Sequence, residues 1–218
     1  MKKKKILSRI GYGVLIGMIF LFSVMIVFNL THIYYNVLGP SMCPTLNEGV
    51  TSQNENKDGV FVSKIKSCRR GDIVVIDKQQ RDIDGNEEYI IKRLIALGGD
   101  KITVRLEDGF YRIILIKNGE ENETILEEPY LPDYSVNEST YIKFNNMIEE
   151  NDELYLDING FLTIPEDEMF YLGDNRTNSY DCANYGPVKR NTIVGRVDYI
   201  VYGNSFMYLQ VLKQFFGW

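Results

Sequence analysis

The sequence predicts a mainly β protein that carries one N-terminal transmembrane helix. Two observations support this fold class. An uncharged apolar run occupies residues 10–30, and the rest of the chain consists of short β-branched and aromatic runs separated by turn residues. No long amphipathic helical pattern follows the apolar run, so we expect one β domain behind one membrane anchor.

The anchor is predicted over residues 10–30, IGYGVLIGMIFLFSVMIVFNL, because 21 residues at about 1.5 Å each cross a hydrocarbon core of about 30 Å. A cleaved signal peptide and a buried core helix are the alternatives. The run exceeds the usual ~7 to 15 apolar residues of a signal peptide, and no A-x-A site follows it, which favours a retained anchor. Five basic residues precede Ile10, and the next charged residue is Glu48. The positive-inside rule therefore places residues 1–9 in the cytoplasm and residues 31–218 outside.

The β domain is predicted from strand-like runs and tight turns. Asp108-Gly109 joins two alternating runs and is a strong hairpin signal. Residues 101–158 are expected to be an elaboration within the domain, because residues 117–158 are rich in Asn, Asp and Glu and suggest exposed loops. The aromatic tail 206–218 is too short to span a bilayer and is expected to pack on the domain. The runs are GVFVSKIK, GDIVVID, EYIIKRLIAL, KITVRLE, FYRIILIK, EMFYLG and TIVGRVDYIVYG.

Charge and composition exclude several classes of function. The net charge is -6, but five of the 24 basic residues precede residue 10, which leaves 19 basic against 30 acidic residues, or -11, for the remainder. A domain this acidic is repelled by phosphate backbones, so we expect no nucleic-acid partner. The only histidine is His32, and Cys43, Cys68 and Cys182 form no C-x-x-C pair, so neither a metal site nor a disulfide framework is indicated. A Ser-His-Asp triad would have to use His32, at the membrane edge.

The first candidate for chemistry is Ser41, in the segment GPSMCPTL at residues 39–46. Gly39, Pro40 and Pro44 impose a turn-rich backbone that can present a hydroxyl. A serine between prolines is more often an ordinary loop residue, so this motif alone does not establish catalysis.

The second candidate is Lys92, in EYIIKRLIALGGD at residues 88–100. Strand alternation puts Lys92 on one face with Ile90 and Leu94. Burial among apolar side chains would lower the lysine pKa and make the amine a usable base. The alternative is an edge-strand lysine whose amine reaches water, next to Arg93.

A third block, YLGDNRTNSYDCANYGPV at residues 171–188, follows a predicted strand. Such polar loops usually only turn the chain. Here Asp174, Arg176 and Asp181 can form charge-assisted pairs, and the Ser179 hydroxyl can orient a neutral lysine amine.

These blocks, in this order, resemble those of bacterial type I signal peptidases, membrane-bound Ser/Lys enzymes that remove signal peptides from exported preproteins. The resemblance extends from Gly39 to about Tyr202. It also includes RGDIVVI (70–76), EEPYL (127–131), IPEDEMFYLGDNR (164–176) and IVGRVDYIVY (193–202). It implies a twisted, largely antiparallel β domain, with the active site near the membrane surface.

Residue by residue, the resemblance implies that Ser41 is the nucleophile, Lys92 the general base and Met42 part of the wall around the substrate's small side chain. It further implies that Ser179 holds the lysine amine and that three charged residues brace the loop behind the base: Asp174, Arg176 and Asp181. No metal or cofactor is needed. The implied partners are exported preproteins with small residues before the cut, together with membrane lipid.

Two of the departures from the family pattern bear on the candidate site. Many members carry Arg two residues after the aspartate that matches Asp181, whereas this chain has Ala183. The ion pair that this Arg would form to brace the loop is therefore not expected from position 183. Gly39 stands where some relatives have a hydroxyl that helps to bind the oxyanion, so the Ser41 backbone N–H would need water or another amide as its partner.

Two alternatives remain at this point. A noncatalytic relative could keep the fold and act in surface pilus assembly, a reading that Ala183 and Gly39 favour and that Ser41 and Lys92 oppose. A Ser/Lys self-cleaving regulator normally carries a DNA-binding domain, and the sequence shows no sign of one.

Overall fold

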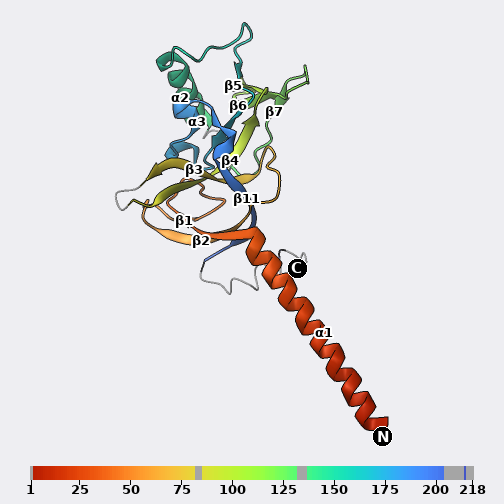
Figure 1. Cartoon of the computed structure of the whole chain (residues 1–218). Coiled ribbons are helices and arrows are strands. Elements are labelled where there is room, and N and C mark those ends of the chain that lie inside the picture. Colours follow the sequence, from red (N-terminus) through yellow and green to blue (C-terminus); the bar gives the residue numbers. More distant parts are fainter. Residues whose placement is uncertain (1, 82–84, 132–136, 204–213, 215–218) are drawn as a thin grey trace.

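The computed structural model describes residues 2–81, 85–131, 137–203 and 214, with side chains from residue 11 onward. A long helix leads into a body of β strands, with further strands and a helix at the far end (Figure 1). The tail at residues 206–218, expected to pack on the domain, lies outside the described residues except for Gln214.

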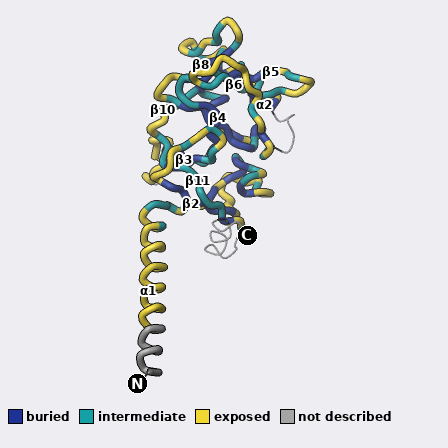
Figure 2. Tube along the Cα trace, turned by 90° about the vertical axis from the view of Figure 1, so that its right-hand side faces the viewer, coloured by how far each residue is buried: buried dark blue, intermediate teal, exposed yellow. Residues whose placement is uncertain are grey.

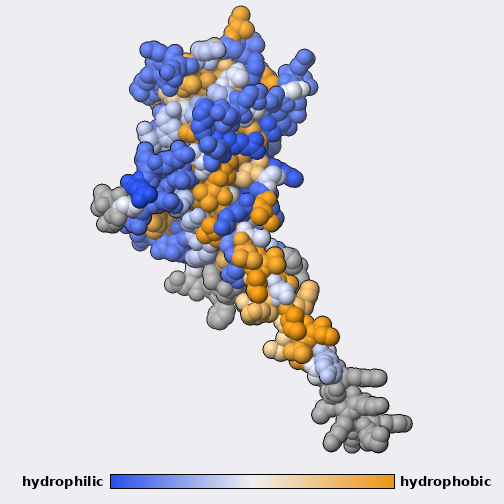
Figure 3. Space-filling view, viewed as in Figure 1, coloured by the Kyte–Doolittle hydropathy of each residue, from blue (hydrophilic) through white to orange (hydrophobic). Residues whose placement is uncertain are grey.

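Helix α1 (Lys2–Thr31) extends away from the strands (Figure 1). Its segment Gly11–Thr31 has a mean hydropathy of 2.5 and is not buried against the rest of the chain. By length and composition this segment can cross a membrane, and its apolar surface stands out in Figure 3. The long apolar N-terminal helix predicted from the sequence is thus present.

The junction between α1 and the β domain contains no spacer. Strand β1 begins at His32, directly after α1, and the Lys64 backbone N–H donates to the Thr31 carbonyl at 3.1 Å. The His32 ring stacks on Phe28 with 4.3 Å between centroids, and His32 Nε2 lies 3.2 Å from the carboxylate of Asp198. The end of the helix is therefore attached to the sheet by both backbone and side chains.

The main sheet of the described residues has seven strands in the order β1-β2-β11-β3-β4-β9-β10, and each neighbouring pair is antiparallel. Strand β4 lies inside this sheet, between β3 and β9. The strands are β1 (His32–Leu38), β2 (Asn56–Ser63), β3 (Ile73–Arg81), β4 (Glu87–Leu97), β9 (Glu168–Leu172), β10 (Val188–Lys189) and β11 (Ile193–Val201).

A second sheet has the order β7-β6-β5-β8. The predicted hairpin is confirmed: Glu107 pairs with Phe110, and Asp108 and Gly109 between them have positive φ angles of 51° and 83°. A two-residue turn with both φ angles positive matches the twist of its strands, which is why an Asp-Gly pair is favoured there. The strands are β5 (Lys101–Glu107), β6 (Phe110–Ile116), β7 (Thr124–Ile125) and β8 (Leu162–Thr163).

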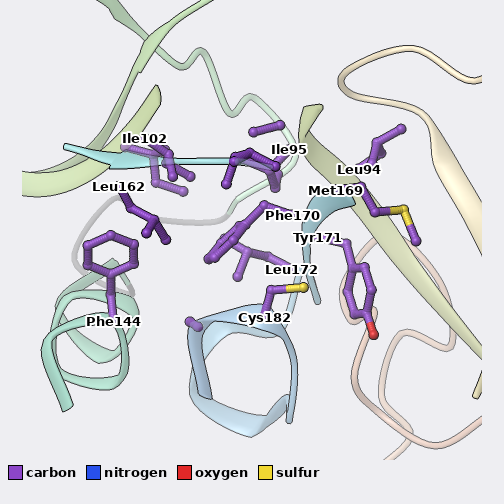
Figure 4. Packing of buried hydrophobic residues seen from close by; sticks show 14 of the residues in the cluster. Leu94, Ile95, Ile102, Phe144, Leu162, Met169, Phe170, Tyr171, Leu172 and Cys182 are labelled. Carbon is purple, nitrogen blue, oxygen red and sulfur yellow. The ribbon is translucent and has the colours of Figure 1, made fainter. Parts of the chain in front are cut away.

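Helix α2 (Asn137–Glu150) corrects the sequence reading, which expected exposed loops and no further long helix in this part of the chain. Asn137, Thr140, Phe144 and Met147 are buried at helical spacing. In Figure 4 the ring of Phe144 lies beside Leu162, and it also makes an edge contact with the Phe170 ring, with 6.2 Å between centroids. The shorter helices are η2 (Arg176–Asn178), α3 (Cys182–Tyr185) and η3 (Arg190–Thr192).

The two largest apolar clusters of the described residues fill most of the body, and Figure 2 shows the buried residues concentrated in the strands. The larger cluster joins the main sheet, the second sheet, α2 and α3, with Leu94, Ile113 and Phe170 among its members. The smaller one packs Met42 and Leu46 against Val60, Val62 and Val75 of the main sheet. The predicted mainly β fold is confirmed. The longest elements that the sequence did not predict are β1 and α2, and the two-residue strands β7, β8 and β10 were not predicted either.

Candidate active site

Ser41 lies in the turn that connects β1 with β2. The neighbouring side chains of Met42 and Leu46 are 1% and 0% exposed, so they anchor the turn in the smaller apolar cluster. Within the turn, the Cys43 N–H donates to the Pro40 carbonyl at 3.0 Å, and the Leu46 N–H donates to the Met42 carbonyl at 2.9 Å. Ser41 itself is only partly buried. The turn therefore holds a reachable serine on a fixed backbone.

Lys92 is buried in β4, where it pairs with Val74 of β3 and is 4% exposed. Because β4 has a strand on each side, Lys92 is not the edge-strand lysine considered in the sequence analysis. Burial lowers the pKa of Lys92 to about 8, against the opposing effect of the carboxylates of Asp181 and Asp174. A substantial fraction of this amine is therefore neutral near pH 8.

The loop after β9 brings the third sequence block to the first two. Leu172 pairs with Arg93, next to Lys92, and the chain then turns past Ser41. A Cβ atom at Gly173 would lie 2.3 Å from Ser179 Oγ and 2.5 Å from the Ser41 carbonyl oxygen. Only glycine fits where these two residues approach the backbone so closely.

Asn175 fastens this loop to the serine turn. Its backbone N–H donates to the Ser41 carbonyl at 3.1 Å, and its side-chain amide donates to the Pro40 carbonyl, also at 3.1 Å. Asn175 was quoted in the sequence analysis as part of a motif, but no role was assigned to it. Its contacts fix the serine turn to the loop that carries Ser179.

Ser179 is 9% exposed, and its hydroxyl has no hydrogen-bond partner among the described residues. A buried hydroxyl without a partner costs free energy, so such groups need a reason to be kept. The convergence of Ser179 Oγ with Ser41 beside Gly173 places this hydroxyl where it can serve the chemistry of the site.

The acidic residues Asp174 and Asp181 are both buried but are satisfied differently. Asp174 accepts two hydrogen bonds from Arg93, at 2.7 Å and 2.6 Å. Asp181 caps α3: it accepts from the Ala183 N–H at 3.2 Å and also from the Gly173 N–H at 2.9 Å. The partner of Asp174 was missed because the sequence reading treated Arg93 only as a neighbour of Lys92.

Arg176 is 2% exposed and bonds to the Glu128 carboxylate and the Asn137 amide, while its Nε donates to the Gly173 carbonyl at 3.1 Å. Glu128 belongs to the EEPYL segment, which was quoted for resemblance without a role. The contacts with Glu128 and Asn137 tie the loop behind Lys92 to the EEPYL segment and to the first residue of α2.

His32 lies at the start of β1, whereas Ser41 follows the end of that strand, so the structure forms no Ser-His-Asp triad between them. Within the described residues, no group of three His, Cys, Asp or Glu side chains is arranged to hold a metal ion.

Comparison with known proteins decides the family. The family model described as signal peptidase, peptidase S26, matches residues 9–202 of this chain. The chain belongs to this signal peptidase family. It is therefore a hydrolase of the serine peptidase class that removes signal peptides, and together with the apolar helix α1 the family makes it a membrane-anchored protein. Nothing among these findings favours a noncatalytic pilus-assembly protein.

Curated relatives of similar length support this assignment. Signal peptidase I of Bacillus caldolyticus is 34% identical over 169 residues, which cover 76% of both chains. Signal peptidase I V of Bacillus subtilis is 30% identical over 168 residues, which cover 77% of this chain and 84% of that one. Signal peptidase I of Streptococcus pneumoniae is 31% identical over 183 residues, or 75% and 78% of the two chains. A solved signal peptidase I from Enterococcus faecalis has a TM-score of 0.37 and 25% identity, covering 62% of this chain and 99% of that one.

Proposed function

We propose that this signal peptidase cuts exported preproteins with Ser41 as nucleophile and Lys92 as general base. The observation that carries the proposal is a lysine 4% exposed inside a β-sheet with its pKa lowered to about 8, in a site where the Ser41 and Ser179 segments converge. An ordinary structural lysine would be paired or reach water.

In the proposed reaction, the neutral Lys92 amine takes the proton of the Ser41 hydroxyl as Oγ attacks the scissile carbonyl carbon. The resulting ammonium then donates that proton to the departing amine when the C–N bond breaks, which leaves the preprotein's signal peptide as an ester on Ser41. Water loses a proton to Lys92 and attacks the ester. The signal peptide leaves with a carboxyl terminus, and Ser41 recovers its proton.

The surrounding residues have supporting roles in this proposal. The Ser179 hydroxyl has no hydrogen-bond partner among the described residues. In this proposal it donates a hydrogen bond to the neutral Lys92 amine and so fixes the orientation of that amine. Asp174, Arg176 and Asp181 brace the loop that carries Ser179 through the buried contacts described above. The oxyanion is stabilised by the Ser41 backbone N–H, because Gly39 offers no side-chain donor.

The substrate is proposed to bind extended along strand edges, with small residues one and three positions before the cut. Met42 is assigned to the wall of the pocket that receives the substrate's small side chain. It packs in the apolar cluster under the serine turn and is 1% exposed, so it would act as a rigid floor that limits the depth of the pocket.

The topology completes the proposal. Residues 1–9 form a cytoplasmic basic tail, residues 10–30 cross the membrane once, and residues 31–218 form the catalytic domain outside, with about 101–158 as an elaboration. Basic residues on one side of the apolar run support this orientation. Contact with membrane lipid at α1 then keeps the enzyme next to membrane-held preproteins.

The test uses the full chain in detergent with a purified preprotein, and it maps the new N-terminus. Ser41→Ala and Lys92→Ala should each reduce cleavage to near background, and the double variant should be no worse, because a nucleophile and its base act as a unit. Retention of cleavage within about tenfold of the parent by either variant, a difference of ~1.4 kcal/mol in barrier, would remove the dyad.

Ser179 has a matched control in Ser63, a second buried serine whose hydroxyl lacks a partner among the described residues. Ser179→Ala should lower kcat, whereas Ser63→Ala, on β2, should cleave like the parent. Equal effects of the two changes would show that Ser179 has no part in orienting the base.

A further inference from the structure

Lys143, on α2, contacts the loop that carries Ser179. Its ammonium donates to the Arg176 carbonyl at 2.7 Å and to the Ser179 carbonyl at 2.8 Å. Arg176 is the first residue of η2, and Ser179 is the residue that directly follows its end. The Arg176 carbonyl also accepts from the Ser139 hydroxyl at 3.3 Å, whereas within the described residues Lys143 is the donor to the Ser179 carbonyl. The position of Ser179 is thus coupled to a helix from another part of the chain.

Asp181, next to this contact, is a buried carboxylate without an ion pair within 4.0 Å among the described residues. It is 2% exposed, and its hydrogen bonds within the described residues come from the backbone N–H groups of Gly173 and Ala183. Residue 183 brings no charge, because it is an alanine, and its methyl group is buried in the larger apolar cluster. The cations that act on Asp181 come from elsewhere: Lys92 on β4 and Lys143 on α2 both interact with it electrostatically.

We propose that Lys143 is a positioning residue for signal-peptide cleavage, which holds the Ser179 segment in place and supplies beside Asp181 the positive charge that position 183 lacks. This inference rests on the proposed roles of Ser41 and Lys92. It assigns to the elaboration a part in the reaction, because α2 lies within it, packs on the larger cluster and bonds directly to the loop that carries Ser179.

The electrostatic consequence concerns Lys92. The groups that act on its amine are the carboxylates of Asp181 and Asp174, which favour the charged form, and Lys143, which opposes it. The neighbouring Cys182 thiol stays uncharged here, because burial raises its pKa well above the ordinary value. A second ammonium near the same carboxylate makes protonation of Lys92 less favourable. Removal of the Lys143 charge should therefore raise the pKa of Lys92 and move the rising limb of the activity profile to higher pH.

The experiment compares Lys143→Met and Lys143→Arg with a matched control, Lys101→Met. Lys101 is a lysine of the same elaboration whose ammonium bonds to Asp157 at 2.9 Å. The full chain in detergent cleaves a purified preprotein between about pH 6 and 10, and thermal unfolding is followed for each variant.

Lys143→Met should lower kcat/KM at pH 8 by about ten- to a hundredfold, as expected for a displaced positioning contact. Its rising limb should move up by roughly half a pH unit or more. Lys143→Arg keeps a charge and donors, so it should keep the limb at the parent position and recover most of the activity. Lys101→Met should match the parent in both.

A Lys143→Met variant with parental kcat/KM and limb would overturn the inference. The inference would also be overturned if Lys143→Met unfolded at a lower temperature than the parent while the rise of kcat/KM with pH stayed at the parent position. That is the behaviour of a purely structural contact. Ser41→Ala and Lys92→Ala are measured alongside: if they still cleave, the proposed dyad fails and this inference with it. If they are inactive and Lys143→Met is parental, only the role of Lys143 fails.

Discussion

Two buried cations stand next to each other on β4, and their surroundings differ sharply. The Arg93 guanidinium donates twice to Asp174 and once to the Gly71 carbonyl, at 2.8 Å, and lies 3.7 Å from the centre of the Tyr130 ring. For Lys92, the described part of the chain offers no hydrogen bond and no ion pair within 4.0 Å, only more distant charges. Burial of a charge is tolerable when it is fully paired and costly when it is not. The comparison separates a cation kept for structure from one whose burial, in the proposed reaction, serves chemistry.

The largest effect is expected when the paired cation is removed. Arg93→Ala leaves the Asp174 carboxylate buried without its partner, and we expect a loss of about 3 to 5 kcal/mol in the free energy of unfolding. Denaturant unfolding of the full chain in detergent measures it. The control is Arg105→Ala, because Arg105 pairs with Glu107 and Glu123 at the surface and should cost less than about 1 kcal/mol. Similar losses for both variants would mean that the Arg93 pair is not special.

Removal of the unpaired cation should have the opposite sign. The pKa of Lys92 is about 8 in the folded chain and 10.5 as the ordinary value, so between these pH values the unfolded chain binds more protons. Stability therefore rises with pH across this window, by about 3 kcal/mol in total, and the contribution of Lys92 is least favourable below pH 8. Lys92→Met should raise the free energy of unfolding at pH 7 by about 1 to 3 kcal/mol and remove that part of the pH dependence.

The same variant should be inactive, while the parent's cleavage should rise with a single apparent pKa near 8. Unfolding curves at several pH values and a pH profile of kcat/KM test both statements. The opposite result would be a Lys92→Met protein that is less stable than the parent at every pH, together with a parent whose kcat/KM rises only near pH 10. That result would show that Lys92 is solvated and that the base lies elsewhere.

The smallest effect is expected from Arg93→Lys, which keeps the charge but loses the two parallel bonds to Asp174 and the flat contact with Tyr130. We expect a loss of about 1 to 2 kcal/mol in the free energy of unfolding, because lysine cannot reproduce a bidentate, stacked guanidinium. A loss as large as that of Arg93→Ala would show that geometry, rather than charge, keeps Asp174 satisfied.

Much of the fold follows from local pattern, and its exceptions are instructive. All seven predicted runs are strands, because alternation and turn residues are local signals. Strand β1 was missed since it follows the apolar run without a break. Helix α2 was missed because its sequence, NESTYIKFNNMIEE, is poor in strong helix formers, and its apolar positions acquire meaning only when Phe144 and Met147 find the core.

The candidate site shows the same division. Ser41 and Lys92 could be named from short motifs, whose roles remain predictions. The partners that support them could not be named, because the contacts join residues 81 positions apart for Arg93 and Asp174, 48 for Arg176 and Glu128, and 36 for Lys143 and Ser179. No local pattern carries information over such separations; only the packed tertiary structure brings these side chains together.

The direct passage from α1 into β1 determines how the enzyme sits at its membrane. Helix α1 ends at Thr31, β1 begins at His32, and Phe28 stacks on His32. No flexible linker therefore separates the β domain from the helix that anchors it. Helices adjust to thinner or thicker bilayers by tilting. Any such tilt turns the whole domain with the helix, and so changes the direction in which Ser41, the proposed nucleophile, faces the membrane. The thickness of the lipid layer thereby becomes part of the geometry of cleavage.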